Sequence, residues 1–579
     1  VMNNDTNNNL NGTVLGNVNN NPLPNDTIET LDGSINSTII DNQVRRISFD
    51  EALLNSKDKY YEIIITSPNA TACNAVTLYV SSLDNYKEGK LLINNEIYQG
   101  DLVFGLLYEA GDFLIIPFII LCIYVLIFTV IVMCICDKKF DISKIAFILI
   151  IGIGLLYIII FPPKTISDED AHINTTYKWA NKLLGDETND GTILKRVEDI
   201  SDKGFELIPS IDGYYKIKTN IGIDEVNNEL VKTPGDRVTD TKITMYLFQV
   251  FGFLIARILN LNYIFLIYLG RFFNLLVYAL GISFAIKRIP VGKIALLVCS
   301  LFPMALNQAA SLSYDVMPII LSFIMLSECM RIANLDTVKI KDFILPTIIM
   351  VMLIPMKSVY CMLMVLIFLI SPKKFNTKKE CYTAFGMFFL IVLSFCIVDN
   401  RDLFYESFEV LSIKNEVVYY EIIDVLKNPI DVFGIVLDTI YDKFDMYIFT
   451  MAGSNLAWFA MGIGVPNTII MIYYFLAIYA LKLDCNSMIQ INKKVLFISA
   501  IGVIGLIFLG ALTWNFKGVN IIDGVQGRYF LPIFPILLFL LPLKKEDVIF
   551  EQSKYNMIIF VVLLQIFTLL RVFSSIVIR

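Results

Sequence analysis

The run of side chains best suited to chemistry in this sequence is SDEDAH, from Ser167 to His172. It holds three carboxylates, those of Asp168, Glu169 and Asp170, and the only histidine of the chain. A carboxylate here could take the proton of an attacking hydroxyl as a general base. Asp168, Glu169 and His172 together could also hold a divalent cation such as Mg²⁺ or Mn²⁺. The run directly follows an apolar stretch, and charges so close to hydrocarbon are costly and usually functional.

Helix capping is a simpler explanation of the same run. Ser167 or Asp168 could be the N-cap of a helix that runs to Leu184, with its side chain accepting a backbone hydrogen bond of the first turn. The sequence leaves both explanations open. It also does not decide which of the three carboxylates faces a site.

Four more charged residues stand near the ends of apolar stretches: Arg271 in YLGRFFN, Asp315 in SLSYD, Lys357 in PMKSVY and Arg528 in QGRYFLP. Three cations that lie at the same membrane level could bind a phosphate or pyrophosphate group, with arginine donating two parallel hydrogen bonds. Each cation could instead extend to the membrane interface without a ligand. Asp315 could be an ordinary loop residue.

Membrane helices must position these residues, because 56% of the 579 residues are hydrophobic and only 17% are charged. The mean hydropathy of +0.64 is far above that of a soluble chain. Since about 20 apolar residues cross a bilayer, the recurring apolar stretches predict roughly a dozen transmembrane helices. The clearest are Phe113 to Cys136, Lys144 to Phe161, Tyr263 to Ile286, Lys293 to Asn307, Val316 to Ile332 and Tyr555 to Phe573.

The net charge of −7 argues against a nucleic-acid partner.

Clusters of basic residues orient these helices, since short cytoplasmic loops are enriched in lysine and arginine. The clusters are Lys138, Lys139 and Lys144; Lys287 and Arg288; Lys373, Lys374, Lys378 and Lys379; Lys493 and Lys494; and Lys544 and Lys545. All five basic clusters lie on the cytoplasmic side of the membrane only if Met245 to Leu259 is an interfacial helix rather than a transmembrane span. Residues 163–244 and 399–466 then form long extracytoplasmic loops. The cytoplasmic loops are short and carry no phosphate-binding glycine loop, which argues against an ATP-driven pump.

Composition divides the chain into four parts. Residues 1–37 are rich in Asn, Asp, Thr and Gly and predict a flexible polar tail. Short β-branched runs in residues 38–112 predict a small extracytoplasmic β-sandwich-like domain. Residues 113–143 add a transmembrane helix and a cytoplasmic turn before the membrane domain of residues 144–579. No cleavable signal is visible at Val1, although the predicted topology puts this end outside the cytoplasm, and the sequence leaves open whether a further signal or anchor helix precedes it.

Six motifs in order carry a resemblance: SDEDAH, LGRFFNLL, FPMALNQAASLSYD, PMKSVY, SNLAWFAMGIGVP and VQGRYFLPIFP. This succession resembles a bacterial family of polytopic membrane proteins of unknown function that is related to the GT-C glycosyltransferases. The resemblance covers roughly Lys144 to Phe573. The β-rich domain is similar to the extracytoplasmic domain often attached to such proteins.

The resemblance implies a GT-C-like fold of about 12 transmembrane helices in the plasma membrane, with its active site outside the cytoplasm. The implied activity is transfer of a sugar from a polyprenyl-phosphate carrier to a surface glycan, lipid or protein. Asp168 and Glu169 match the two acidic positions of the family motif and would be catalytic. Ser167 stands where the family usually has proline, and Asp170 adds a carboxylate, so the inward-facing carboxylate stays undecided.

The residues expected to bind substrate are His172, Arg271, Asp315, Lys357, Trp458, Gln526, Arg528 and Tyr529. A transporter or flippase of lipid-linked saccharides is the alternative function. It predicts polar residues spread through the spans and often an internal repeat, and the sequence shows neither. A non-catalytic sugar-binding or assembly protein would need only one or two spans, so a dozen argues against it.

Overall fold

The structure of the chain is a computed structural model. The described residues are 10–17, 30–35, 60–66, 80–81, 91–93, 96–99, 101–102, 112–188, 190–200, 204–222, 226–235, 237–239, 241–399, 401, 419–457, 462–483, 491–542 and 551–578. The chain divides into two compact units, Val1–Gly111 and Asp112–Arg579. Each unit is described by itself.

The first unit contains antiparallel strands. Their bounds are β1 Leu10–Asn17, β2 Thr30–Ile35, β3 Tyr60–Thr66, β4 Val80–Ser81, β5 Leu91–Ile93, β6 Glu96–Tyr98 and β7 Asp101–Leu102. One sheet has the order β2-β1-β3, and β4 pairs with β7 and β5 with β6. Both β1 and β2 lie within residues 1–37, so the predicted boundary at residue 37 does not coincide with the boundary of this sheet. The rest of the predicted sandwich lies outside the described residues and stays a prediction.

The second unit is built from helices. In the described part of the chain, seven are long and apolar enough to cross a membrane: α1 Asp112–Asp137, α2 Ile142–Ile160, α7 Tyr263–Arg288, α10 Val316–Ala333, α12 Lys378–Asp399, α17 Lys493–Leu512 and α19 Glu551–Val577. Shorter apolar helices are α6 Ile243–Ile258, η3 Ser358–Leu369, α16 Asn467–Leu483, and η6 Gly527–Ile533 followed by α18 Phe534–Phe539. The structure therefore confirms a helical polytopic chain, and the total of about 12 spans stays a prediction.

One expected span is interrupted. The stretch from Lys293 to Asn307 forms two short helices, α8 Lys293–Ser300 and α9 Pro303–Ala309. Pro303 stands at the first turn of α9, where it has no N–H to continue the hydrogen-bond ladder of α8. Further short elements of this unit are η2 Ile340–Phe343, α11 Ile344–Leu353 and η4 Pro372–Lys374.

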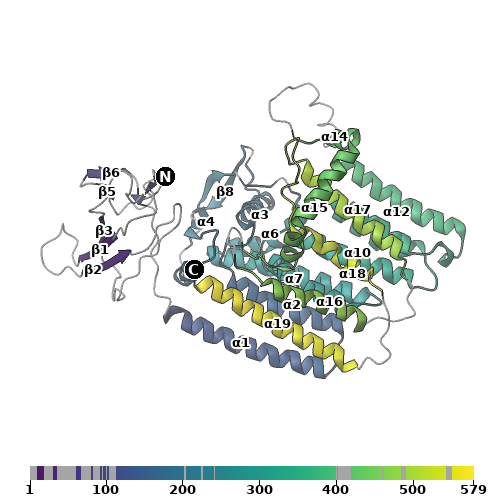
Figure 1. Ribbon diagram of the computed structural model, residues 1–579, viewed down its shortest axis with the longest axis horizontal. Coiled ribbons are helices and arrows are strands. Elements are labelled where there is room, and N and C mark those ends of the chain that lie inside the picture. The colour runs from purple at the N-terminus through teal and green to yellow at the C-terminus, as the bar shows by residue number, and fades with distance from the viewer. Residues whose placement is uncertain are drawn as a thin grey trace. The chain divides into compact units, whose positions relative to one another are not determined.

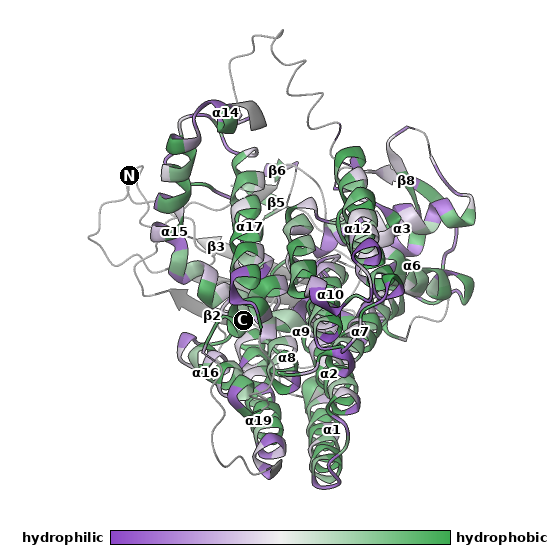
Figure 2. Cartoon of the chain, turned by 90° about the vertical axis from the view of Figure 1, so that its right-hand side faces the viewer, coloured by the Kyte–Doolittle hydropathy of each residue, from purple (hydrophilic) through white to green (hydrophobic). Residues whose placement is uncertain are grey.

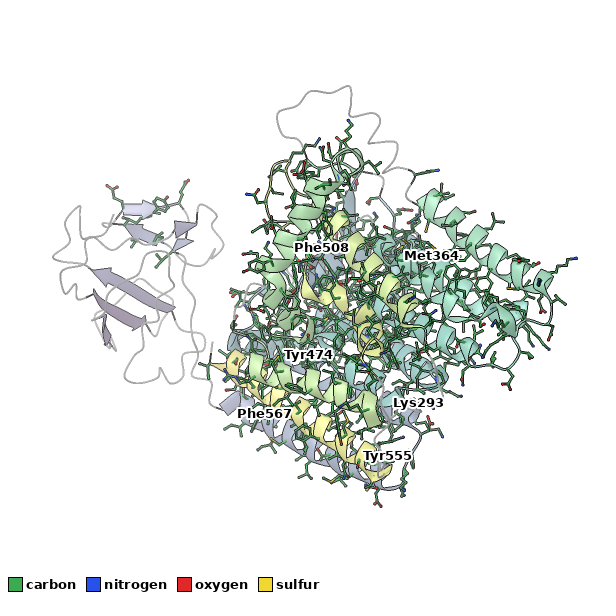
Figure 3. The ribbon with its side chains drawn as sticks, turned by 45° about the vertical axis from the view of Figure 1, so that its right-hand side comes forward. Lys293, Met364, Tyr474, Phe508, Tyr555 and Phe567 are labelled. Atoms are coloured by element: carbon green, nitrogen blue, oxygen red, sulfur yellow. The ribbon has the colours of Figure 1, made fainter. Side chains whose placement is uncertain are left out.

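Hydrophobic side chains fill the space between the helices. In Figure 1, α1 and α19 lie side by side, and both contact α2. Figure 2 shows hydrophobic residues along α1, α2, α17 and α19. Tyr474 of α16 lies in this interior (Figure 3), with its ring centroid 5.4 Å from those of Phe302 and Phe534. Such burial follows from helices that are apolar on most of their circumference.

Glycines let α7 approach its neighbours closely. A Cβ on Gly252 of α6 would lie 2.6 Å from the carbonyl of Leu269 in α7, and a Cβ on Gly281 of α7 would lie 2.4 Å from Ile320 of α10. Small residues at helix interfaces permit this close backbone contact in membranes. α7 therefore packs closely against α6 on one side and α10 on the other. This packing fixes the position of the side chains on α7, including Arg271.

The segment between α2 and α6 is structured. It comprises α3 Glu169–Leu184, β8 Thr192–Arg196, α4 Val197–Ile200, α5 Ile211–Asn220 and β9 Leu230–Pro234, with β8 and β9 paired antiparallel. α6, predicted to be interfacial, has 16 residues and a length of about 24 Å, short of the roughly 30 Å of a hydrocarbon core. Residues 419–466 contribute α14 Ile422–Lys427 and α15 Pro429–Ala452.

Candidate functional site

Asp168 stands at the turn that joins α2 to α3. It occupies the N-cap position of α3, but its side chain makes no capping hydrogen bond there. Its φ is +62°, a left-handed conformation that non-glycine residues adopt rarely and aspartate more readily than most. Instead of capping, the carboxylate Oδ2 accepts a hydrogen bond of 2.6 Å from Nη2 of Arg528. Capping therefore does not explain Asp168.

Glu169 forms a closed clamp with Arg271. Both side chains are fully buried. Arg271 donates from Nε to Glu169 Oε1 at 2.8 Å and from Nη2 to Oε2 at 2.5 Å, and the Lys164 N–H donates to the same Oε2 at 2.9 Å. The remaining guanidinium donors bind the carbonyls of Ile158, Phe161 and Pro162 at the end of α2. All five donors of Arg271 are used in holding α2, α3 and α7 together.

Asp315 lies between two cations from distant parts of the sequence. It precedes α10, and its Oδ1 accepts a 2.5 Å hydrogen bond from Lys357 Nζ at the start of η3. Its Oδ2 lies 3.3 Å from Nε of Arg528 in η6. Burial raises the pKa of Asp315, but Lys357 and Arg528 outweigh it and hold the pKa below its ordinary value. The residue is therefore an ionised carboxylate.

We call Asp168, His172, Asp315, Lys357 and Arg528 the charged cluster. Its two aspartates and two cations balance in formal charge. Asp168 is the open member, with 41% of its side chain exposed, against 8% for Arg528, 12% for Asp315 and 19% for Lys357. A ligand from solution would therefore meet Asp168 first and the cations behind it.

Aromatic rings line the cluster. Lys357 Nζ lies 4.3 Å from the ring centroid of Tyr529 and 5.2 Å from that of Tyr314, distances typical of cation–π contacts. His172 packs edge-on against Tyr314, and its Nδ1 shares a 2.7 Å hydrogen bond with the Tyr246 hydroxyl. Tyr246 and Tyr314 were not expected from the sequence. The position of Tyr314 directly before Asp315 was the available signal.

The other expected residues occupy different places. Gln526 is exposed just before η6, and Asp170 forms an ion pair with Arg237, which is 56% exposed. Trp458 lies outside the described residues. Asp168, Glu169 and His172 are not assembled as a metal site, and the described part of the chain holds no group of three or more His, Cys, Asp or Glu placed for one. The reason is that Glu169 turns to Arg271 while Asp168 turns to Arg528.

His172 is expected to be neutral at physiological pH. Burial lowers its pKa to about 4, and Arg528 adds to the lowering, although the nearby Asp168 and Asp315 oppose it. In the unfolded chain the pKa of a histidine is about 6.5, so the unfolded state binds a proton at a higher pH than the folded state does. The free energy of unfolding should therefore decrease as the pH falls from about 6.5 toward 4.

Because His172 is the only histidine, the two imidazole ¹⁵N resonances of ¹⁵N-histidine-labelled protein report it directly. We expect a neutral imidazole at pH 6 and a titration midpoint near 4 in detergent-solubilised protein. A midpoint near 6.5 would contradict the buried environment. His172→Gln is the matched control for the accompanying loss of stability in acid.

The comparisons with known proteins give one match. Residues 149–537 match the model of a family described as predicted membrane protein (DUF2142). The matched range contains the whole charged cluster and the Glu169–Arg271 clamp. No curated protein and no solved structure matches the chain.

Proposed function

The chain belongs to this DUF2142 family of predicted membrane proteins, and from that premise and the charged cluster we propose that it is a glycosyltransferase. It would move a sugar from a polyprenyl-phosphate carrier to a cell-surface glycan, lipid or protein, outside the cytoplasm. The observation that carries the proposal is the contact between the partly exposed Asp168 carboxylate and Arg528. Arg528 also contacts Asp315, and Asp315 in turn accepts a hydrogen bond from Lys357, so both cations lie near Asp168. This arrangement pairs one accessible base with two cations suited to a phosphate.

The place of the cluster suits a lipid-linked donor. Arg271, which anchors α3 beside the cluster, and Lys287 at the basic end of α7 are separated by 16 residues, or about 24 Å of helix. The cluster therefore belongs to the end of the bundle opposite the lysines, which the charge distribution predicts to be extracytoplasmic. At that level a polyprenyl tail can stay in hydrocarbon while its phosphate and sugar reach water.

Donor binding would free the base. In the resting arrangement, Arg528 and Lys357 are neutralised by Asp168 and Asp315. An arriving donor phosphate competes with these carboxylates for the same donors, and the exposed Asp168 is the easier one to displace. Asp168 then loses its hydrogen bond with Arg528 and faces the acceptor as a free carboxylate.

In the chemical step, the acceptor oxygen forms a bond to the anomeric carbon and its proton passes to Asp168. The bond between the anomeric carbon and the phosphate oxygen breaks with inversion, and its electron pair leaves on polyprenyl phosphate. Lys357 and Arg528 stabilise the charge that develops on this leaving group. The base is Asp168 rather than Glu169, since Glu169 is fully buried and both its oxygens accept hydrogen bonds from Arg271 or the Lys164 N–H.

Purified protein in proteoliposomes tests the proposal directly. We expect it to transfer labelled sugar from polyprenyl phosphate to an added cell-envelope fraction and to release polyprenyl phosphate in equal amount. A nucleotide sugar in place of the lipid donor is the control and should give no product. Movement of the labelled lipid across the bilayer with no new glycosidic bond would instead establish the flippase alternative.

A further inference from the structure

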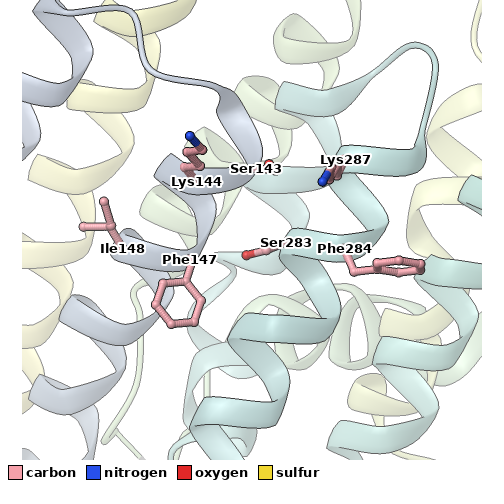
Figure 4. A pocket seen from close by; sticks show the side chains of 7 residues that line it. All are labelled: Ser143, Lys144, Phe147, Ile148, Ser283, Phe284 and Lys287. Atoms are coloured by element: carbon pink, nitrogen blue, oxygen red, sulfur yellow. The ribbon is translucent and has the colours of Figure 1, made fainter.

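A shallow hollow of about 320 Å³ lies between α2 and α7, at the lysine-rich end of both helices (Figure 4). Its lining residues come from the first turns of α2 and the last turns of α7: Ser143, Lys144, Phe147, Ile148, Ser283, Phe284 and Lys287. It is separate from the charged cluster, and the proposed sugar transfer makes no use of it.

The two lysines leave positive charge at the hollow. Lys144 and Lys287 are exposed, and neither ammonium group makes a hydrogen bond or ion pair with another described residue. The neighbouring Arg288 forms an ion pair with the buried Glu328, which also pairs with Arg331. Asp141 is the nearby acid. Its Oδ1 accepts hydrogen bonds from Ser143, and its carboxylate attracts Lys144 and Lys293, so one negative charge stands against these two lysines and Lys287. The hollow therefore keeps an excess of positive charge.

A hydroxyl group inside the hollow lacks a partner. Ser283 Oγ is buried and makes no hydrogen bond with any described residue. Serines inside helices usually donate to a carbonyl one turn earlier, as Ser327 does to Phe323 here. Figure 4 shows the Ser283 hydroxyl between the side chains of Phe147 and Phe284. A buried donor of this kind costs free energy unless a ligand or water accepts from it.

From these observations we propose that the hollow binds an anionic phospholipid. Its phosphate would lie between Lys144 and Lys287, an oxygen of its glycerol ester region would accept from Ser283, and an acyl chain would follow Phe147 and Phe284. The apolar lining favours a lipid over free phosphate, because a small ion gains nothing from aromatic contact. Basic pockets between membrane helices commonly hold acidic head groups.

The test uses full-length protein in nanodiscs titrated with fluorescent phosphatidylglycerol. Each lysine near an anionic surface contributes about 1 kcal/mol, so Lys144→Gln with Lys287→Gln should weaken binding roughly 10- to 30-fold. Lys378→Gln with Lys379→Gln removes the same charge from exposed positions on α12 and should change it less than twofold. Ser283→Val should weaken binding about threefold, consistent with the loss of one modest hydrogen bond.

Two results would overturn the proposal. An equal loss in both lysine pairs would show a general surface charge effect with no site between α2 and α7. Competition by millimolar inorganic phosphate with no dependence on Ser283 would show a free-anion site. Size-exclusion profiles of all variants exclude misfolding as the cause, and none of these residues belongs to the charged cluster.

Discussion

Replacing Asp168 with asparagine is expected to reduce sugar transfer roughly 100- to 10,000-fold, the range for loss of a general base. Asparagine keeps the size of the side chain and can still accept a hydrogen bond from Arg528, but it cannot take the acceptor proton. The measurement is single-turnover transfer of labelled sugar in proteoliposomes.

Donor affinity distinguishes this role from a structural one. In the proposed mechanism the donor phosphate must displace the Asp168 carboxylate from Arg528, and asparagine would be displaced more easily because it carries no charge. We therefore expect Asp168→Asn to bind the polyprenyl-phosphate donor at least as tightly as the natural chain while turning it over far more slowly. Arg528→Gln should instead weaken donor binding and slow transfer together, since it removes a phosphate contact.

Asp170→Asn is the matched control, because Asp170 is the adjacent carboxylate and pairs with the exposed Arg237 rather than with the cluster. It should leave transfer within about twofold, in keeping with the small contribution of exposed ion pairs. Equal losses in Asp168→Asn and Asp170→Asn, or wild-type transfer in both, would contradict the assignment of Asp168 as the base.

Replacing Arg271 with methionine is expected to destabilise the protein by about 3–5 kcal/mol, because it leaves Glu169 as a buried carboxylate without its cation. It also removes the donors of three carbonyls at the end of α2. The measurement is the midpoint of thermal unfolding in detergent, together with the yield of monodisperse protein.

Two further variants separate the ion pair from general damage. Arg271→Met with Glu169→Met removes both charges and should recover part of the loss, because no unpaired charge stays buried. Arg237→Met breaks an ion pair whose cation is 56% exposed while Asp170 is 14% exposed, and should cost about 1 kcal/mol, well below the loss expected for Arg271→Met. If Arg271→Met were as stable as Arg237→Met, the clamp would not hold α2, α3 and α7 together.

The sequence was informative where physical rules act over short distances. Hydrophobic stretches predicted the long helices, and the apolar run before Ser167 placed the acidic motif at a helix end. The expectation that Arg271, Lys357 and Arg528 converge came from their shared membrane level. The structure places Arg528 against Asp168 and joins Lys357 to it through Asp315.

The sequence could not predict which partner each carboxylate of SDEDAH contacts. Asp168, Glu169 and Asp170 are consecutive, so each points in a different direction as the turn enters α3. Which partner each one meets depends on α7, η6 and the loop before α6, all distant in sequence. The sequence therefore identified the acidic motif and the other charged residues near it. The pairing of Glu169 with Arg271 depends on how α3 and α7 pack in the tertiary structure.

The left-handed backbone of Asp168 has an evolutionary consequence. Aspartate and asparagine are among the few residues with a Cβ that tolerate this conformation, and their codons differ by one nucleotide. Under the proposed mechanism, a single point mutation can thus produce a chain that keeps its fold and its membrane location and still binds the lipid carrier, but no longer transfers the sugar. On the same proposal, we expect inactive carrier-binding copies among gene duplicates of this protein to carry asparagine at residue 168.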